Sequence, residues 1–539
     1  MQTAQEINIP ESVFTHPAYQ KAVETIQIQE SKIQTQESKI QYLNLRVDQL
    51  REALFGRKSE KRTINDGLSR QISFLETDKE DRPEVEVVET EITVPEHTRR
   101  KRKRYVDENG NLSHFPEYLP REDIYVEPEG QKECEHCGKE KTVLSSRVTE
   151  KLQVIPAKYY VERNIQQTYV CNCKNSEPER AKAPESAIPK SVLGNSFLSS
   201  MLTNKFAWHL PFYRQSQMLE EINIEINRNV MINAANKLGD LLTPVVVEMA
   251  KQIKSCDVVH IDETPTVVAK RESNGKLKYN KDSYYWPILG GEQVVFYYTG
   301  NRKHCNVEDI LGKTFRGTLQ SDGYQAYKNY VEAKEDVTLA FCWDHCRRKF
   351  YKIKDHEPLA NEALTLIKEL YQVEREIKEK QIAQEEIPEY RETNALPILE
   401  DLKKWVTTVR DDPTVLPKSD LYNACSYTIA HWDGLTKYIS NGAIPISNIK
   451  IEQQIRNLKL GAKNWLFASS ESGARTVAVM NSLVCTCKMN GINILEYFND
   501  ILKRVDTDSA SKLTPLAWIA EQNSKEQQDI AEPADADSF

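Results

Sequence analysis

Strand patterns gather in the middle of this chain and are then interrupted by a long helical stretch. Short apolar and β-branched runs, which are typical of strands, occur at 257–261, 284–289, 293–299, 318–321 and 338–343. From 358 to about 440 the pattern is helical and charged, and helices continue after 447. The chain is therefore expected to build a mixed α/β core that a large helical insertion divides.

The N-terminal part carries a heptad repeat. Apolar side chains seven residues apart, and the residues three positions after the first four of them, are Ile26, Ile33, Ile40, Val47, Leu54, Gln29, Gln36, Leu43 and Leu50. This spacing predicts a coiled coil over 1–62 that joins copies of the chain. A single surface helix is the alternative, although so narrow an apolar stripe makes a lone helix marginally stable. The acidic and then basic residues at 63–118 are typical of a linker.

Two cysteine pairs follow the linker. Cys134 and Cys137 have two residues between them, and Cys171 and Cys173 have one. Four thiolates from two such pairs can bind one zinc ion tetrahedrally, so we expect a structural zinc-binding module at 119–176. The alternatives are that His136 replaces one thiolate, or that the pairs are unrelated reduced cysteines.

Helical patterns flank the strand region. Two amphipathic segments, 213–222 and 227–238, fit a helix-turn-helix and a pair of packed core helices equally well. After the zinc module we expect a helical segment at 189–255 and the first part of the core at 256–355. The insertion is expected at 356–440 and the second part of the core at 441–480. A C-terminal helical segment at 481–504 and a tail at 505–539 come last.

Three acidic residues stand where the fold can bring them together. Asp262 and Asp322 each end a predicted strand, and Glu452 lies on a predicted helix. Three carboxylates at one sheet edge can hold two Mg²⁺ ions, with Mn²⁺ as an alternative, around a scissile phosphodiester. Strand alternation places Glu263 on the opposite face from Asp262, outside the expected site. Because the chain has 80 acidic residues, this trio is weak evidence on its own.

Basic residues accompany two of these motifs. One group of candidates for contacts with DNA phosphates follows the predicted strand at 338–343 and consists of Arg347, Arg348 and Lys349. The second group lies on the same helical face as Glu452 and consists of Arg456, Lys459 and Lys463. A solvated face explains the second group equally well. The segment 342–346, with two cysteines and a histidine, can look like a metal site, but packing behind the carboxylates is the favoured interpretation.

Composition excludes several classes of protein. No apolar run approaches the roughly 18–20 residues of a membrane span, and the N-terminus has no secretory signal pattern. Eleven cysteines among 539 residues are too few for a disulfide scaffold, and we expect a cytoplasmic protein. The net charge of −8 argues weakly against a general polyanion binder, so local charge must carry DNA binding.

The combination resembles transposases of the insertion sequence 66 family over roughly residues 26–502. The similar motifs are the heptad run that ends in LREALFGRKSEKR, the cysteine segments CEHCGK and TYVCNCK, the strand motifs VHIDET, LQSDGYQAY and FCWDHCRRKF, and the later segments EQQIR and GAKNWLFASSESGA. The resemblance implies an RNase H-like core whose DDE triad is Asp262, Asp322 and Glu452. Ser447 replaces a usual aspartate ahead of the third acid and can cap its helix.

The function that the resemblance implies is DNA transposition. Such an enzyme cuts the ends of an insertion element and joins the 3′-hydroxyls to target DNA by two-metal chemistry. The implied partners are the terminal repeats, the target DNA, further copies of the chain and accessory proteins that the element encodes. The alternatives are an inactive or repurposed DNA-binding protein and a metal-dependent nuclease that does not join strands.

Overall fold

The computed structural model describes residues 186–271 and 277–531 of the 539-residue chain, with separate short stretches between 105 and 184. The chain divides into two compact units, Met1–Leu152 and Gln153–Phe539. The expected coiled coil and the four candidate zinc ligands Cys134, Cys137, Cys171 and Cys173 lie outside the described residues. Two small antiparallel pairs are also described: β1 (Tyr105–Val106) with β2 (Leu112–Ser113) in the first unit, and β3 (Thr168–Tyr169) with β4 (Glu179–Arg180) in the second.

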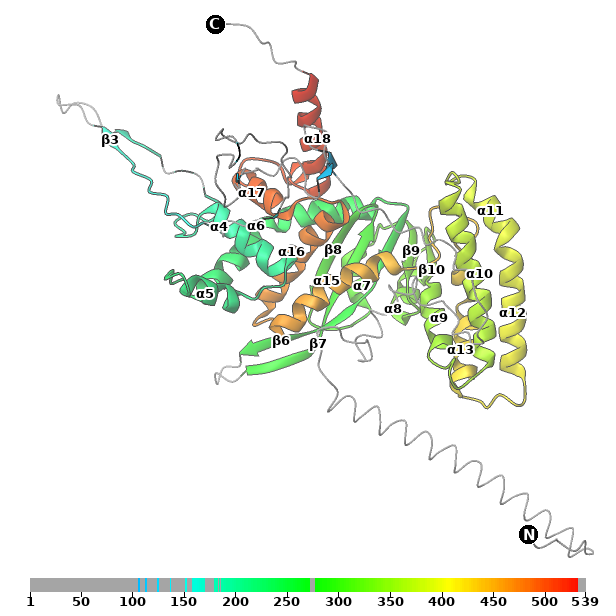
Figure 1. Ribbon diagram of the computed structural model, residues 1–539. Coiled ribbons are helices and arrows are strands. Elements are labelled where there is room, and N and C mark those ends of the chain that lie inside the picture. Colours follow the sequence, from blue (N-terminus) through cyan, green and yellow to red (C-terminus); the bar gives the residue numbers. More distant parts are fainter. Residues whose placement is uncertain are drawn as a thin grey trace, which may run out of the picture. The chain divides into compact units, whose positions relative to one another are not determined.

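The second unit is built on a mixed sheet (Figure 1). Its strands are β5 (Val258–Ile261), β6 (Thr264–Arg271), β7 (Leu277–Gly290), β8 (Gln293–Thr299), β9 (Gly317–Ser321) and β10 (Val337–Phe341). β9 pairs in parallel with both β5 and β10, whereas β7 pairs antiparallel with β5, β6 and β8. The expected hairpin is confirmed, because Gly290 pairs with Gln293 across a turn in which Gly291 has a φ of +56°.

β5 and β6 lie end to end along one side of β7. His260 pairs with Leu289, and Thr264 pairs with Tyr285, so the register against β7 continues from β5 into the start of β6 and shifts only between Thr266 and Val268. The interruption falls at residues 262–263. This break lies level with the end of β9. The residues that follow β5 and β9 therefore lie at the same edge of the sheet, at the carboxyl ends of two neighbouring parallel strands.

Helices cover both faces of the sheet. Before β5 stand α4 (Asn195–Leu202), the π-helix η2 (Thr203–Ala207), α5 (Phe212–Glu220) and α6 (Arg228–Lys254), and after β8 come α7 (Cys305–Leu311) and α8 (Gln325–Glu332). Alternate strand residues face opposite sides: Trp286 and Ile288 pack into the core beneath α6, α7 and α8, while Tyr285 and Leu289 pack against helices nearer the C-terminus.

The C-terminal helices complete the second face and one edge. They are α15 (Ile449–Trp465), α16 (Glu471–Met489), α17 (Ile494–Arg504), the short 3-10 helix η3 (Ala510–Lys512) and α18 (Pro515–Ala531). The hydroxyls of Thr486 and Ser482 on α16 accept backbone N–H groups of Val294 and Phe296 at 3.1 and 2.9 Å. Helix α16 therefore covers the edge of β8 that would otherwise expose unpaired backbone groups.

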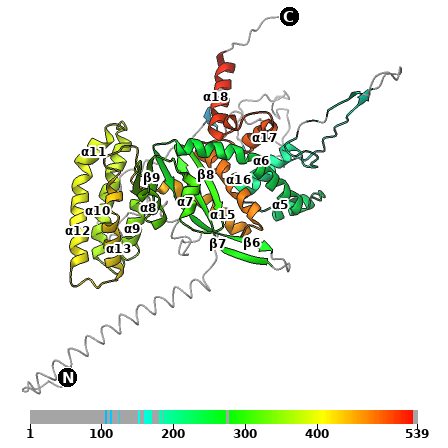
Figure 2. The same cartoon turned by 180° about the vertical axis from the view of Figure 1, so that it is seen from behind.

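Six helices stand between β10 and α15, and all but the first lie where the helical insertion is expected. They are α9 (Trp343–Tyr351), α10 (Leu359–Glu379), α11 (Ile387–Asn394), α12 (Leu396–Asp411), α13 (Asp420–Ala430) and α14 (Trp432–Thr436). They enclose a hydrophobic core of their own, in which Ile367, Leu370, Leu402 and Val406 are fully buried. Figures 1 and 2 show α10, α11, α12 and α13 gathered beside the sheet.

The structure changes several expected boundaries. The limit at 480/481 falls inside α16, whose buried face packs with α6 and the sheet in one core. The expected tail at 505–539 contains α18, and Trp518 of this helix is buried against Tyr497. Helix α6 extends far beyond residue 238 and is buried along its length, which favours packed core helices over a helix-turn-helix. No described helix is both long enough and apolar enough to span a membrane.

Candidate active site

Asp262 and Asp322 lie beside each other at the open end of the sheet. β5 and β9 pair in parallel with His260 opposite Gln320, so two further residues along each strand bring the two acids to the same level. Each is the first residue after its strand. The backbone N–H groups of Glu263 and Tyr324 donate to the two carboxylates at 2.7 and 2.9 Å. The expected convergence of these two acids is therefore seen.

A fourth acid, Glu263, belongs to the same end of the sheet, which the sequence did not predict. Its carboxylate accepts hydrogen bonds from the guanidinium of Arg302 and the hydroxyl of Tyr327, and its side chain is only 3% exposed. Strand alternation fails here because 262–263 is the interruption between β5 and β6. The acid pair Asp262-Glu263 was the one sequence signal available, and nothing in the sequence pointed to Arg302.

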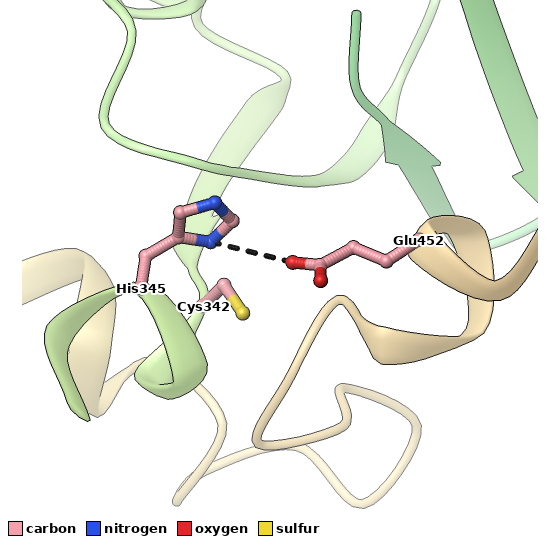
Figure 3. A group of neighbouring side chains, drawn as sticks. All are labelled: Cys342, His345 and Glu452. Atoms are coloured by element: carbon pink, nitrogen blue, oxygen red, sulfur yellow. Dashed lines mark ion pairs between the residues drawn. The ribbon is translucent and has the colours of Figure 1, made fainter. Parts of the chain in front are cut away.

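Glu452 lies in the first turn of α15, with its carboxylate turned towards α9. It accepts a hydrogen bond from the guanidinium of Arg348, and its Oε1 lies 3.7 Å from Nδ1 of His345. Among the described residues, one trio of potential ligand atoms lies within 4.8 Å of one another, and it consists of Cys342, His345 and Glu452 (Figure 3). Asp262 and Asp322 are not part of so tight a group.

Asn448 holds the start of α15 against β5. Its Nδ2 donates to the carbonyl oxygen of Ile261 at 3.1 Å, and its Oδ1 lies 2.6 Å from Nδ1 of His260. Since Oδ1 must then accept, the hydrogen of His260 is assigned to Nδ1. Asn448 is the first residue before α15 but makes no side-chain cap, and the expected cap by Ser447 is wrong. The Asn448 side chain instead binds β5 and so fixes the first turn of α15, which carries Glu452, near the sheet.

Electrostatics link the three acids. Burial raises the pKa of Asp262 well above its usual range, and the carboxylates of Glu263, Asp322 and Glu452 raise this pKa further. Burial also raises the pKa values of Asp322 and Glu452, although Arg348 opposes the shift at both. Groups that raise one another's pKa lie within electrostatic reach. Such an excess of buried negative charge favours a bound cation.

We expect the Asp262→Asn protein to be more stable than the parent at neutral pH without divalent metal. The amide can still accept the N–H of Glu263, but it removes a buried charge, which should stabilise the fold by about 1–3 kcal/mol. An acid with a raised folded pKa binds more protons when folded, so it lowers stability as the pH rises above its unfolded pKa towards the folded one. Thermal unfolding with chelator should therefore show a gap that widens as the pH rises from the unfolded pKa of an aspartate, about 4, towards the raised folded pKa. A constant or inverted gap would contradict this assignment.

Two side chains from the insertion pack on the backbone next to Asp322. A Cβ atom at Gly323 would overlap with Nε2 of His431 and contact the hydroxyl of Tyr427, so only glycine fits there. Nδ1 of His431 lies 2.7 Å from the carbonyl oxygen of Tyr427. The insertion therefore supports the end of β9 from a distance of about 100 residues in sequence, which no motif predicted.

The expected DNA contacts divide into two kinds. Arg348 forms an ion pair with Glu452, and Nζ of Lys459 donates to the carbonyl oxygen of Pro265 at 2.6 Å. Lys349 and Lys463 are exposed, whereas Arg347 and Arg456 are partly buried. Arg348 and Lys459 therefore have polar partners within the fold. Of the other four, Arg347 lies over the ring of Tyr351 and Lys349 over the ring of Tyr427, at 5.4 and 4.2 Å from the ring centres.

Comparisons with known proteins match most of the chain. Residues 190–476 match the family model described as “Transposase IS66 family”. Residues 42–124 match “Transposase C of IS166 homeodomain”, and residues 131–174 match “zinc-finger binding domain of transposase IS66”. The three matches follow the order expected from the sequence.

Similar proteins occur in Sinorhizobium fredii (strain NBRC 101917 / NGR234). Uncharacterized protein y4jD is 28% identical over 429 residues, which cover 76% of this chain and 83% of the relative. Uncharacterized protein y4hP is 26% identical over 500 residues, which cover 88% of this chain and 87% of the relative. The similarity thus extends over most of each protein.

Proposed function

Because the chain belongs to the IS66 family of transposases, we propose that it cuts the ends of an insertion element and joins the freed 3′-hydroxyls to target DNA. The observation that carries this proposal is the pairing of Asp262 and Asp322 at two parallel strand ends, with Glu452 in electrostatic reach of both. These three acids are the proposed catalytic residues. The family places the protein among DNA-processing enzymes, and the order of cutting and joining is our proposal.

We further propose that the sheet is an RNase H-like core. Its support is the strand order β8, β7, β5 with β6, β9 and β10, in which the first three positions are antiparallel and the remaining pairs are parallel. The helical insertion enters between the second and third acids. In this order both aspartates directly follow adjacent central strands.

The oxygen ligands of the acids suit magnesium. Two Mg²⁺ ions, or Mn²⁺, held by Asp262, Asp322 and Glu452 would activate the attacking oxygen and stabilise the leaving one. The chain itself supplies positioning: Arg302 and Tyr327 fix Glu263, the neighbour of Asp262, and Asn448 fixes the helix of Glu452. No Ser or Tyr nucleophile is needed, because water and the DNA hydroxyl are the attacking groups.

DNA binding is supported by the transposase and homeodomain family models. We propose that Arg347, Lys349, Arg456 and Lys463 contact phosphates, and that Arg348 and Lys459 act instead through Glu452 and Pro265. Binding that rests on phosphate contacts should weaken steeply as salt increases.

The decisive experiment is a strand-transfer assay with the terminal repeats that flank the element. The purified protein, labelled repeat DNA, a target plasmid and Mg²⁺ should yield joined products. Cutting without joining would favour the nuclease, and binding without cutting would favour an inactive DNA-binding protein. Either of these two outcomes would contradict the proposal.

The zinc-finger match supports structural zinc, and we propose Cys134, Cys137, Cys171 and Cys173 as its ligands. Replacing Cys134 and Cys137 together by serine is expected to remove about one zinc ion per chain, because a site with two thiolates cannot close around the metal. Elemental analysis of protein purified without chelator measures this. Unchanged zinc content in the double variant would show that other residues bind the metal.

We propose that residues 1–62 hold copies of the chain together, since two element ends must be joined in one reaction. Ile33→Asp with Ile40→Asp buries two charges in the predicted seam and should shift the protein to a smaller assembly. Analytical ultracentrifugation gives the answer. Gln29→Asp with Gln36→Asp is a weaker change at already polar positions and should disturb assembly less. An unchanged sedimentation profile for the isoleucine variant would refute a zipper.

A further inference from the structure

A thiol, an imidazole and a carboxylate converge beside the catalytic acids (Figure 3). Cys342 directly precedes α9, and His345, three residues later, lies on the same face of its first turn. Glu452 approaches from the first turn of α15. All three potential ligand atoms lie within 4.8 Å of one another, so small side-chain movements would bring them around one ion.

The surroundings of Cys342 suit a thiolate that is bound to a metal. Its side chain is buried, and the backbone N–H of Asn448 donates to Sγ at 3.1 Å. The backbone N–H of His345 also donates to it. These donors stabilise negative charge on sulfur, although burial on its own raises the pKa of the thiol well above its usual range. A cation that replaces the thiol proton removes this conflict.

His345 presents a ring nitrogen to the same point. Nε2 lies 3.4 Å from Nη1 of Arg348, which can only donate, so without metal Nε2 accepts and Nδ1, directed at Glu452, carries the ring hydrogen. Nδ1 is buried and makes no hydrogen bond.

The remaining residues of this motif point elsewhere. Asp344 accepts a hydrogen bond from the hydroxyl of Tyr371 at 2.8 Å, and Sγ of Cys346 lies 3.0 Å from Oγ1 of Thr428. Both therefore serve the helical insertion. The motif divides by helical face, and only Cys342 and His345 turn towards the third acid.

We propose that Cys342, His345 and Glu452 form a further metal site, which takes a thiophilic divalent cation such as Zn²⁺ or Co²⁺. Sulfur and nitrogen ligands suit these ions, whereas Mg²⁺ requires oxygen. On binding, the metal–sulfur bond replaces the S–H bond, and the thiol proton passes to solvent. Nδ1 of His345 loses its hydrogen to the metal bond, and Nε2 gains one as Arg348 withdraws, so the imidazole stays neutral. The cation also replaces the guanidinium of Arg348 at Glu452. The site is distinct from the zinc module, which uses other cysteines.

One consequence rests on the proposed function. Because Glu452 is also the proposed third acid, an ion held here would draw its carboxylate away from Mg²⁺ and inhibit strand transfer. The test of the site itself uses metal binding alone, so the site can fail while transposition stands, and transposition can fail while the site stands.

The test is a Co²⁺ titration of the full chain with its zinc module loaded, followed by the thiolate-to-cobalt charge-transfer band. The parent and the Cys346→Ser control should gain this band with about one equivalent of Co²⁺, and excess Mg²⁺ should not remove it. The Cys342→Ser protein should lack it. His345→Gln, a change at a less buried position, should weaken binding at least about tenfold while Cys342 stays intact. No band in the parent, or equal bands in the parent, Cys346→Ser and Cys342→Ser proteins, would overturn the site.

Discussion

Replacing any one of Asp262, Asp322 and Glu452 by its amide is expected to reduce Mg²⁺-dependent cleavage and strand transfer at least about a hundredfold. Each change keeps the shape of the side chain and removes one charge from a group that must balance two divalent cations. Binding to the terminal repeats should persist, because it rests on the basic residues and not on the acids. Cleavage and joining on repeat DNA, measured beside a gel-shift assay of the same proteins, separate the two effects.

The matched controls are Asp336→Asn and Glu471→Gln. Asp336 is exposed and forms an ion pair with the exposed Arg316, and Glu471 is exposed at the first position of α16. Both variants should retain activity within about twofold, since exposed ion pairs contribute little. If Glu452→Gln cleaves like the parent while Glu471→Gln does not, the third acid has been misassigned. Glu263→Gln is no control, because Glu263 pairs with Arg302 beside the site.

The sequence predicted those elements whose own residues indicate their structure, such as apolar runs and turn glycines. Buried strands such as β5 and β9 consist of apolar runs, and the turn at Gly290 and Gly291 is marked by its residue type. β6 and the first half of β7 were missed because their residues are polar and charged, as in LKYNKDS, and their pairing is set by a partner strand. Propensity cannot report a pairing that tertiary contacts impose.

The candidate site was predictable to a similar extent. Strand ends pointed to Asp262 and Asp322, since adjacent parallel strands must end at one edge. The distant contacts were not predictable: Arg348 on Glu452, Glu263 with Arg302, and His431 beside Gly323 all join segments far apart in sequence. The boundary at 480/481 failed for a related reason, because α16 belongs to the core through packing that its sequence does not announce.

The Asn448→Ala protein is expected to lose about 2–4 kcal/mol of unfolding free energy, because the change leaves two buried polar groups without partners. These are Nδ1 of His260 and the carbonyl oxygen of Ile261, which the fully buried Asn448 side chain now satisfies. Water cannot easily replace it among side chains so closely packed. The backbone N–H that donates to Cys342 is kept, so the loss reports on the side chain alone.

Activity should fall further than stability alone predicts. Asn448 is the tie that fixes the first turn of α15, and a displacement of about 1 Å at Glu452 would cost on the order of a hundredfold in rate. Assays at a temperature where the variant is fully folded isolate this effect from unfolding. Asn464→Ala, an exposed change on the same helix, should leave both quantities nearly unchanged. A folded Asn448→Ala protein with parental strand-transfer activity would mean that Glu452 is held by other contacts, with Arg348 the first to examine.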